Sequence, residues 1–262
     1  MTCGAAASLT ISLNAILNEG DEVIVFAPYF PEYKVFVEQA KGKIVIVNPI
    51  EKTFFPNLEE LKKCINSKTK AIIINSPNNP TGVVYDEQTI IEISTILKDK
   101  SKEYNQEIYL ISDEPYRELI YHDIKYPFVT NYYDNSIVCY SFSKSLSLPG
   151  ERIGYIFVSP KTDKAAEIYA AVCGAGRALG YVCAPSLFQY MIPHILGKVS
   201  DLSVYNENRR LLYSALTDIG YTAVKPDGAF YLFVKSPEAN AKAFCERARK
   251  YELLLVPSDS FG

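Results

Sequence analysis

The sequence is poor in the residues that build metal sites. It has two histidines, His122 and His194, and six cysteines that form no C-x-x-C pair. Structural zinc sites need four such ligands at short spacing, so we predict no metal. Several cysteines lie within apolar runs, where a reduced thiol behaves as a small hydrophobic side chain. A reducing, cytoplasmic location is therefore expected.

Long apolar runs and a strong charge of one sign are also missing. The formal net charge is -3, which provides no general attraction to nucleic acid or to an anionic membrane. No apolar run approaches the roughly 18 residues that span a bilayer. The start, "MTCGAAASLT", lacks the basic segment of a secretory signal, so none is expected. With 48% apolar and 22% charged residues, the composition is that of an ordinary globular protein.

Short β-branched runs alternate with longer amphipathic stretches in the first part of the chain. Strands are predicted at 22–27, 43–48, 70–75, 107–112, 136–141 and 153–159. Helices are predicted at 5–18, at 57–66 with Asn57 as N-cap, and at 86–103 with Asp86 as N-cap. Most of the strand runs are continuously apolar, which is typical of strands covered on both faces. This pattern favours a three-layer α/β/α fold with a mostly parallel sheet.

After residue 160 the pattern changes. Helical stretches at about 161–175 and 186–218 are followed by a predicted hairpin at 221–236, a helix near 237–250 and the strand "LLLVPS" at 253–258. This order indicates a smaller α+β unit joined through long helices. The predicted division is a large domain at 1–160, interdomain helices at 161–200 and part of a small domain at 201–262.

Polar and aromatic residues follow four of the predicted strands. The stretches are "PYFPEY" after 22–27, "SPNNPTG" after 70–75, "DEPYREL" after 107–112 and "SFSKSL" after 136–140. Ligands of open α/β sheets bind outside the carboxyl ends of the strands, so these loops predict one shared site. Lys144 lies in the last of them, where a lysine is costly to bury without a partner or a chemical task.

These stretches, together with "TCGAAASL" before them and "LPGERIGY" after them, resemble the class I/II aminotransferases, a family of fold-type I pyridoxal-phosphate enzymes. The motifs occur in the family's order and spacing, and the resemblance covers nearly the whole chain. The resemblance implies the family's large domain plus part of its small domain, and a homodimer. It also implies transfer of an amino group between an amino acid and a 2-oxo acid.

The resemblance implies a role for each matched residue at the cofactor ring. Lys144 would form a Schiff base with the aldehyde of pyridoxal 5'-phosphate and later shuttle a proton. Asp113 would pair with the protonated pyridine nitrogen. Asn79 and Tyr116 would hydrogen-bond the 3-oxygen of the ring, and Tyr29 would stack on its face. Lys144, Asp113 and Tyr116 form the expected catalytic set.

The phosphate of the cofactor would be held by two further segments. The start of the first helix offers free N–H groups and the positive end of the helix dipole, and small side chains there let an anion approach. Hydroxyl groups and a forked guanidinium on the other side add donors and charge. The members of this set are Gly4, Ala5, Ala6, Ser141, Ser143 and Arg152.

Other readings of the same motifs are weaker or remain open. "SFSK" matches the S-x-x-K of penicillin-binding proteins, but their S-D-N and K-T-G motifs are absent. "GAGRALG" has the wrong spacing and context for a dinucleotide loop. A C–S lyase on the same scaffold would share every cofactor residue, so it stays possible from the sequence, as does a non-catalytic module of this fold.

Members of the family are longer than this chain. They carry an N-terminal segment that helps to close the site and a C-terminal arginine that binds the substrate's α-carboxylate. The resemblance offers no residue of this chain for either role. We therefore expect a chain truncated at both ends, with most of the cofactor site and slow turnover.

Overall fold

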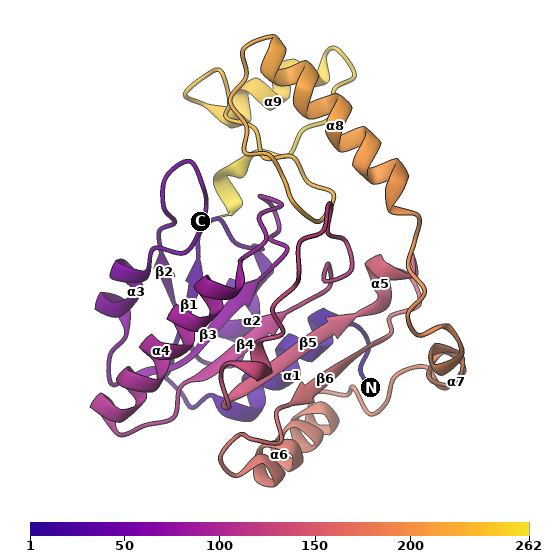
Figure 1. Ribbon diagram of the computed structural model, residues 1–262. Helices are drawn as coiled ribbons and strands as arrows, with labels where there is room; N and C mark the ends of the chain where they lie inside the picture. The colour runs from indigo at the N-terminus through magenta and orange to yellow at the C-terminus, as the bar shows by residue number, and fades with distance from the viewer. Residues whose placement is uncertain (262) are drawn as a thin grey trace.

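Continuous runs of β-branched residues form the central sheet in a computed structural model, which describes residues 1–261 (Figure 1). The six strands are β1 (Glu22–Phe26), β2 (Lys43–Val47), β3 (Thr69–Asn75), β4 (Tyr109–Asp113), β5 (Ser136–Ser141) and β6 (Gly154–Val158). Their order in the sheet is β2-β1-β3-β4-β5-β6. Neighbours from β2 to β5 pair in parallel, and β6 is antiparallel to β5. Every strand predicted before residue 160 is present.

Alternate residues of the central strands pack against opposite helix layers. The helices on the two faces are α1 (Ala5–Ile16), α2 (Glu32–Gln39), α3 (Leu58–Cys64), α4 (Glu87–Tyr104) and α6 (Ala165–Ala178). Ile72 and Ile74 of β3 join the core that includes side chains of α3 and α4. Ala71 and Ile73 point the other way, into the core beneath α1 and α2. Burial on both faces explains why the strands lack alternation, and the predicted three-layer α/β/α class is confirmed.

Side-chain caps fix the starts of two helices where the sequence predicted them. Asn57 Oδ1 accepts a hydrogen bond from the backbone N–H of Glu60 at 3.1 Å, and Asp86 Oδ1 accepts one from Thr89 at 2.8 Å. The short helix α2 was missed, because the stretch "PYFPEY" looked like a loop rich in proline.

The register of the sheet gathers the carboxyl ends of three strands. Asn75 at the end of β3 lies beside Asp113 at the end of β4, and Ser141 ends β5 next to them, opposite Gly154 of β6. The start of the chain joins the same edge, since the N–H of Thr2 donates to the carbonyl of Gly154 at 2.9 Å. The segment that leads into α1 therefore lies beside the end of β5.

The remaining helices lie mostly beyond the end of the sheet (Figure 1). They are α7 (Ser186–Ile195), α8 (Leu202–Asp218) and α9 (Ala241–Arg249). The one-turn helix α5 (Phe142–Ser145) after β5 and two 3-10 turns, η1 (Val129–Asn131) and η2 (Ser258–Ser260), complete the elements of the described residues. The stretch predicted as helical over 186–218 is thus two helices. Gly197, with φ +80, lies in the link between them. Among residues 1–261 no helix is both long enough and apolar enough to cross a membrane.

Two predictions in the last part of the chain are wrong for the described residues. The expected hairpin at 221–236 is reduced to one isolated bridge between Ala223 and Val234. "LLLVPS" is irregular, with Leu254 79% and Val256 80% exposed. A strand needs neighbours for its backbone groups and its apolar side chains, and residues 1–261 provide none there. The three-part division of the chain stays a prediction.

Candidate functional site

Lys144 lies on the short turn α5 (Phe142–Ser145), directly after β5. The side chain of Ser141 caps this turn by accepting the N–H of Ser143 at 3.2 Å. The Lys144 amine lies 5.1 Å from the centre of the Phe230 ring. Partial burial and then the charge of Arg152 lower the pKa of Lys144. A larger neutral fraction of the amine is what a nucleophile or a general base requires.

Asp113 ends β4 and is almost fully buried, with 4% of its surface exposed. Its Oδ2 accepts a hydrogen bond of 2.6 Å from the hydroxyl of Tyr33, whereas its Oδ1 has no hydrogen-bond partner among residues 1–261. Burial raises the pKa of Asp113 to about 7, although the Tyr33 hydrogen bond acts in the opposite direction. A buried acceptor without a donor costs free energy, so this carboxyl group suits a ligand that brings a donor or a cation.

Tyr33 is a site residue that sequence reasoning missed. It lies on α2, four residues before Val37, and both side chains are buried against the sheet. The i, i+4 spacing of a tyrosine and a valine after a proline marks the buried face of a helix. The hydroxyl at the end of a buried aromatic side chain needs a polar partner, and that signal could have linked Tyr33 to a strand end.

Asn79 and Tyr116 lie on the loops that follow β3 and β4. The N–H of Asn79 donates to Asn75 Oδ1 at 2.7 Å, and Asn75 Nδ2 donates to the carbonyl of Asp113 at 2.9 Å. These bonds tie the "SPNNPTG" loop to the end of β4. The Asn79–Pro80 bond is cis. Tyr116 is buried, and its hydroxyl lies 2.6 Å from that of Tyr231.

The start of α1, the end of β5 and Arg152 meet at a place rich in donors, which we call the anion space. Gly4 caps α1 with φ +86, and a Cβ at this position would lie 2.5 Å from Arg152 Nη2 and 3.4 Å from Ser141 Oγ. Arg152 Nη1 donates to Ser143 Oγ at 3.1 Å. The guanidinium forms no ion pair with a side chain of residues 1–261, so its charge is available to a ligand.

The first backbone N–H groups of α1 follow directly on Gly4. The helix begins at Ala5, followed by Ala6. The amides of the first turn have no acceptor inside a helix, and the dipole of a 12-residue helix favours negative charge at this end. The structure therefore brings Gly4, Ser141, Ser143 and Arg152 together, with Ala5 and Ala6 next in the chain. Their role as phosphate ligands stays a prediction.

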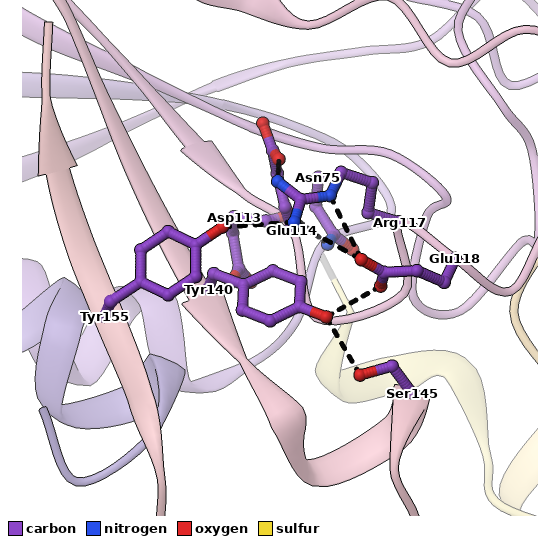
Figure 2. A network of polar contacts seen from close by, with 8 residues as sticks. All are labelled: Asn75, Asp113, Glu114, Arg117, Glu118, Tyr140, Ser145 and Tyr155. Carbon is purple, nitrogen blue, oxygen red and sulfur yellow. Dashed lines mark hydrogen bonds and ion pairs between the residues drawn. The ribbon is translucent and has the colours of Figure 1, made fainter. Parts of the chain in front are cut away.

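A partly buried ionic network supports the loop after β4 and the turn α5. Figure 2 shows its members, Asn75, Asp113, Glu114, Arg117, Glu118, Tyr140, Ser145 and Tyr155. Arg117 donates to Glu114 Oε2 at 3.0 Å and to Glu118 Oε1 at 3.3 Å. The Tyr140 hydroxyl donates to Glu118 Oε2 and lies 2.8 Å from both that oxygen and Ser145 Oγ. Because Ser145 is part of α5, the network fixes the lysine turn relative to the neighbouring loop.

Tyr29 is linked to the predicted ring residues through Tyr33, whose hydroxyl donates to Asp113. Its side chain is buried in the core beneath α1 and α2, with its ring parallel to that of Tyr33 at 6.5 Å. Burial and the charge of Glu38 raise the pKa of its phenol. The neighbouring Phe30 packs edge-on against Tyr33 at 5.7 Å. The stacking role of Tyr29 stays a prediction, with Phe30 as a second candidate.

Comparison with known proteins matches this architecture to one family. The model of "Aminotransferase class I and II" matches residues 1–262. The chain belongs to the class I and II aminotransferases. It is 34% identical over 268 residues to the probable aspartate aminotransferase of Methanocaldococcus jannaschii, a match that covers 100% of this chain and 69% of that protein.

Solved aminotransferase structures have the same fold. An amino transferase from Eubacterium rectale has a TM-score of 0.97 and 56% identity, with 100% of this chain and 66% of that chain covered. An aromatic aminotransferase from Pyrococcus horikoshii has a TM-score of 0.86 and 30% identity, with 100% and 70% covered. The chain thus spans about two thirds of the length of these relatives.

Aminotransferases of this family use pyridoxal phosphate, and the residues of this chain fit that cofactor. The unpaired Oδ1 of Asp113 suits a protonated pyridine nitrogen. The space that a Cβ on Gly4 would fill, next to the uncompensated guanidinium of Arg152, suits a phosphate. Lys144 provides the primary amine that an aldehyde requires.

Proposed function

We propose that this chain transfers an amino group between an amino acid and a 2-oxo acid. The observation that carries the proposal is the convergence of three groups at one edge of the sheet. They are the amine of Lys144, the unpaired carboxylate oxygen of Asp113, and the anion-binding space beside Gly4 and Arg152. An aldehyde, a pyridine nitrogen and a phosphate are the three polar parts of pyridoxal phosphate.

Bound pyridoxal phosphate supplies an electron sink that stabilises negative charge at the α-carbon of an amino acid. Asp113 would hold the proton on the ring nitrogen through Oδ1, with Tyr33 fixing the other oxygen. Burial raises the pKa of Tyr116 above its ordinary value, so its phenol stays protonated and can donate to the 3-oxygen of the ring. Lys144 Nζ, whose pKa is lowered, would remove the proton from the α-carbon of the amino acid and return it to the carbon of the cofactor's aldehyde group.

Reductive labelling tests the assignment of Lys144. The protein is mixed with pyridoxal phosphate and reduced with borohydride, and the modified peptide is mapped by mass spectrometry. We expect the label on Lys144, and its loss in Lys144→Ala. Lys161→Ala is the matched control, because Lys161 is an exposed lysine on a turn away from the site, and it should label like the wild type. Label elsewhere, or a wild-type spectrum in Lys144→Ala, would overturn the assignment.

A substrate screen separates the transferase from a C–S lyase. An amino acid alone should convert the bound cofactor to its amine form, and a 2-oxo acid should restore the original absorbance. Release of pyruvate and ammonia from cysteine or cystathionine, without an added oxo acid, would instead identify a lyase.

We also propose a homodimer and a cytoplasmic location. α7 and its flanks expose six large apolar side chains, Tyr181, Val182, Leu187, Tyr190, Met191 and Leu196. Apolar groups gathered on one part of a surface support an interface between subunits. Light scattering should give twice the chain mass, and Tyr190→Lys should shift it toward the monomer. All six cysteines are free thiols, which supports a reducing compartment.

A further inference from the structure

The segment 226–231, which we call the aromatic loop, is held between the two loops that carry Asn79 and Tyr116. The N–H groups of Asp227 and Gly228 both donate to the carbonyl of Gly82, each at 2.9 Å. On the other side, the N–H of Ala229 donates to the carbonyl of Leu119 at 2.8 Å. The aromatic loop therefore depends on the loops after β3 and β4 for its position.

Close packing at Gly228 and hydrogen bonding by Arg209 hold the aromatic loop in this position. A Cβ on Gly228 would lie 2.6 Å from Pro77 Cγ and 2.8 Å from the carbonyl oxygen of Leu119, so only glycine fits. Arg209 of α8 donates from Nη1 to the carbonyl of Pro226 at 2.9 Å and stacks over the ring of Tyr121 at 4.7 Å. α8 is thus connected to the site through the aromatic loop.

The aromatic loop brings two side chains to the proposed catalytic residues. Phe230 lies under the Lys144 amine at 5.1 Å and meets the Tyr116 ring edge-on at 5.6 Å. Tyr231 meets the same ring at 5.6 Å, and the two hydroxyl oxygens are 2.6 Å apart. Neither hydroxyl has another hydrogen-bond partner among residues 1–261.

A phenol has one proton to donate, so the hydrogen bond between Tyr116 and Tyr231 uses the proton of one of them. If Tyr116 donates to Tyr231, no proton of Tyr116 is left for an acceptor in the site. If Tyr231 donates to Tyr116, the Tyr116 proton is free, and accepting one hydrogen bond strengthens it as a donor. An oxygen acceptor in front of Tyr116, such as the 3-oxygen of pyridoxal phosphate, selects the second arrangement.

We propose that Tyr231 is a positioning residue, which donates to Tyr116 and directs the Tyr116 proton to the 3-oxygen of the cofactor. The inference rests on the proposed function, because it takes pyridoxal phosphate as the ligand. It makes the aromatic loop, more than a hundred residues after Tyr116, a part of the cofactor site.

A double-mutant cycle tests the proposal. The dissociation constant of pyridoxal phosphate is measured for the wild type, Tyr231→Phe, Tyr116→Phe and the double variant, together with circular dichroism in the cofactor's absorption band. Loss of one hydrogen bond predicts about fivefold weaker binding in Tyr231→Phe. The double variant should bind no more weakly than Tyr116→Phe, since Tyr231 acts only through Tyr116. The dichroic band of Tyr231→Phe should resemble that of Tyr116→Phe.

Tyr205→Phe is the matched control, because its ring stacks on Phe230 at 5.7 Å without a hydrogen bond to Tyr116. It should bind the cofactor like the wild type. An unchanged dissociation constant in Tyr231→Phe would overturn the positioning role. So would a double variant whose loss of affinity equals the product of the losses in Tyr231→Phe and Tyr116→Phe. Borohydride labelling in every variant separates this outcome from failure of the proposed function, which would appear as absence of label on Lys144 in the wild type.

Discussion

Asp113→Asn should change how the stability of the cofactor-free protein depends on pH. The folded-state pKa of about 7 lies above the ordinary value of 3.8, a difference that corresponds to about 4 kcal/mol. The folded state favours the protonated carboxyl group, and this preference stabilises the fold fully below pH 3.8. The stabilisation is lost as the pH rises through 7, because the buried group must then ionise. Between pH 5 and pH 7 the free energy of unfolding of the wild type should fall by about 2 kcal/mol because of this group alone. Asparagine is neutral throughout and avoids that loss.

Urea unfolding at pH 5, 6, 7 and 8, followed by far-ultraviolet circular dichroism, measures the effect. The free energy of unfolding of Asp113→Asn minus that of the wild type should rise by about 2 kcal/mol from pH 5 to pH 7 and level off above pH 8. The buried Glu114, whose pKa is raised by burial, titrates in both proteins and cancels to first order. Asp123→Asn, the same substitution at an exposed aspartate, is the control.

A difference that stays constant across this pH range would refute the reasoning that Asp113 is a carboxyl group buried without a counter-charge. Saturating pyridoxal phosphate provides a second check. A pyridine N–H against Oδ1 would lower the pKa of Asp113, so the wild-type curve should become flatter. The same slope with and without cofactor would mean that Asp113 does not meet the ring.

Three further substitutions address the anion space and the carboxyl group. Gly4→Ala should weaken binding of pyridoxal phosphate at least about tenfold, because the new methyl group would collide with the guanidinium of Arg152. Gly20→Ala is the control: Gly20 has a similar φ of +90, but its Cβ would lie in open space, so binding should be unchanged. Arg152→Lys keeps the charge and loses the fork, so a titration should show weaker binding of cofactor and of inorganic phosphate, by about tenfold. Tyr33→Phe removes the hydrogen bond that lowers the pKa of Asp113. The fall in the free energy of unfolding should therefore extend to higher pH than in the wild type. An unchanged midpoint of that fall would contradict the assignment.

The sheet and its helices could be predicted because they leave local marks in the sequence. Two-sided burial produced the continuous apolar runs of the central strands β1, β3, β4 and β5, and the caps at Asn57 and Asp86 act within three residues. The last part of the chain could not be predicted in this way. "LLLVPS" has the composition of a strand, but a strand forms only where another strand offers its backbone groups.

The sequence alone was enough to predict the chemistry of the candidate site, since Lys144, Asp113, Asn79 and the predicted phosphate-binding stretch are motifs of nearby residues at the ends of strands or the start of a helix. Tertiary structure decided which groups support them. Tyr33 reaches Asp113 across 80 positions and Tyr231 reaches Tyr116 across 115. Local sequence patterns predict burial and hydrogen bonds between residues that are only a few positions apart. A contact between distant segments depends on how sheet, helices and loops pack together, and no short stretch of sequence contains that information.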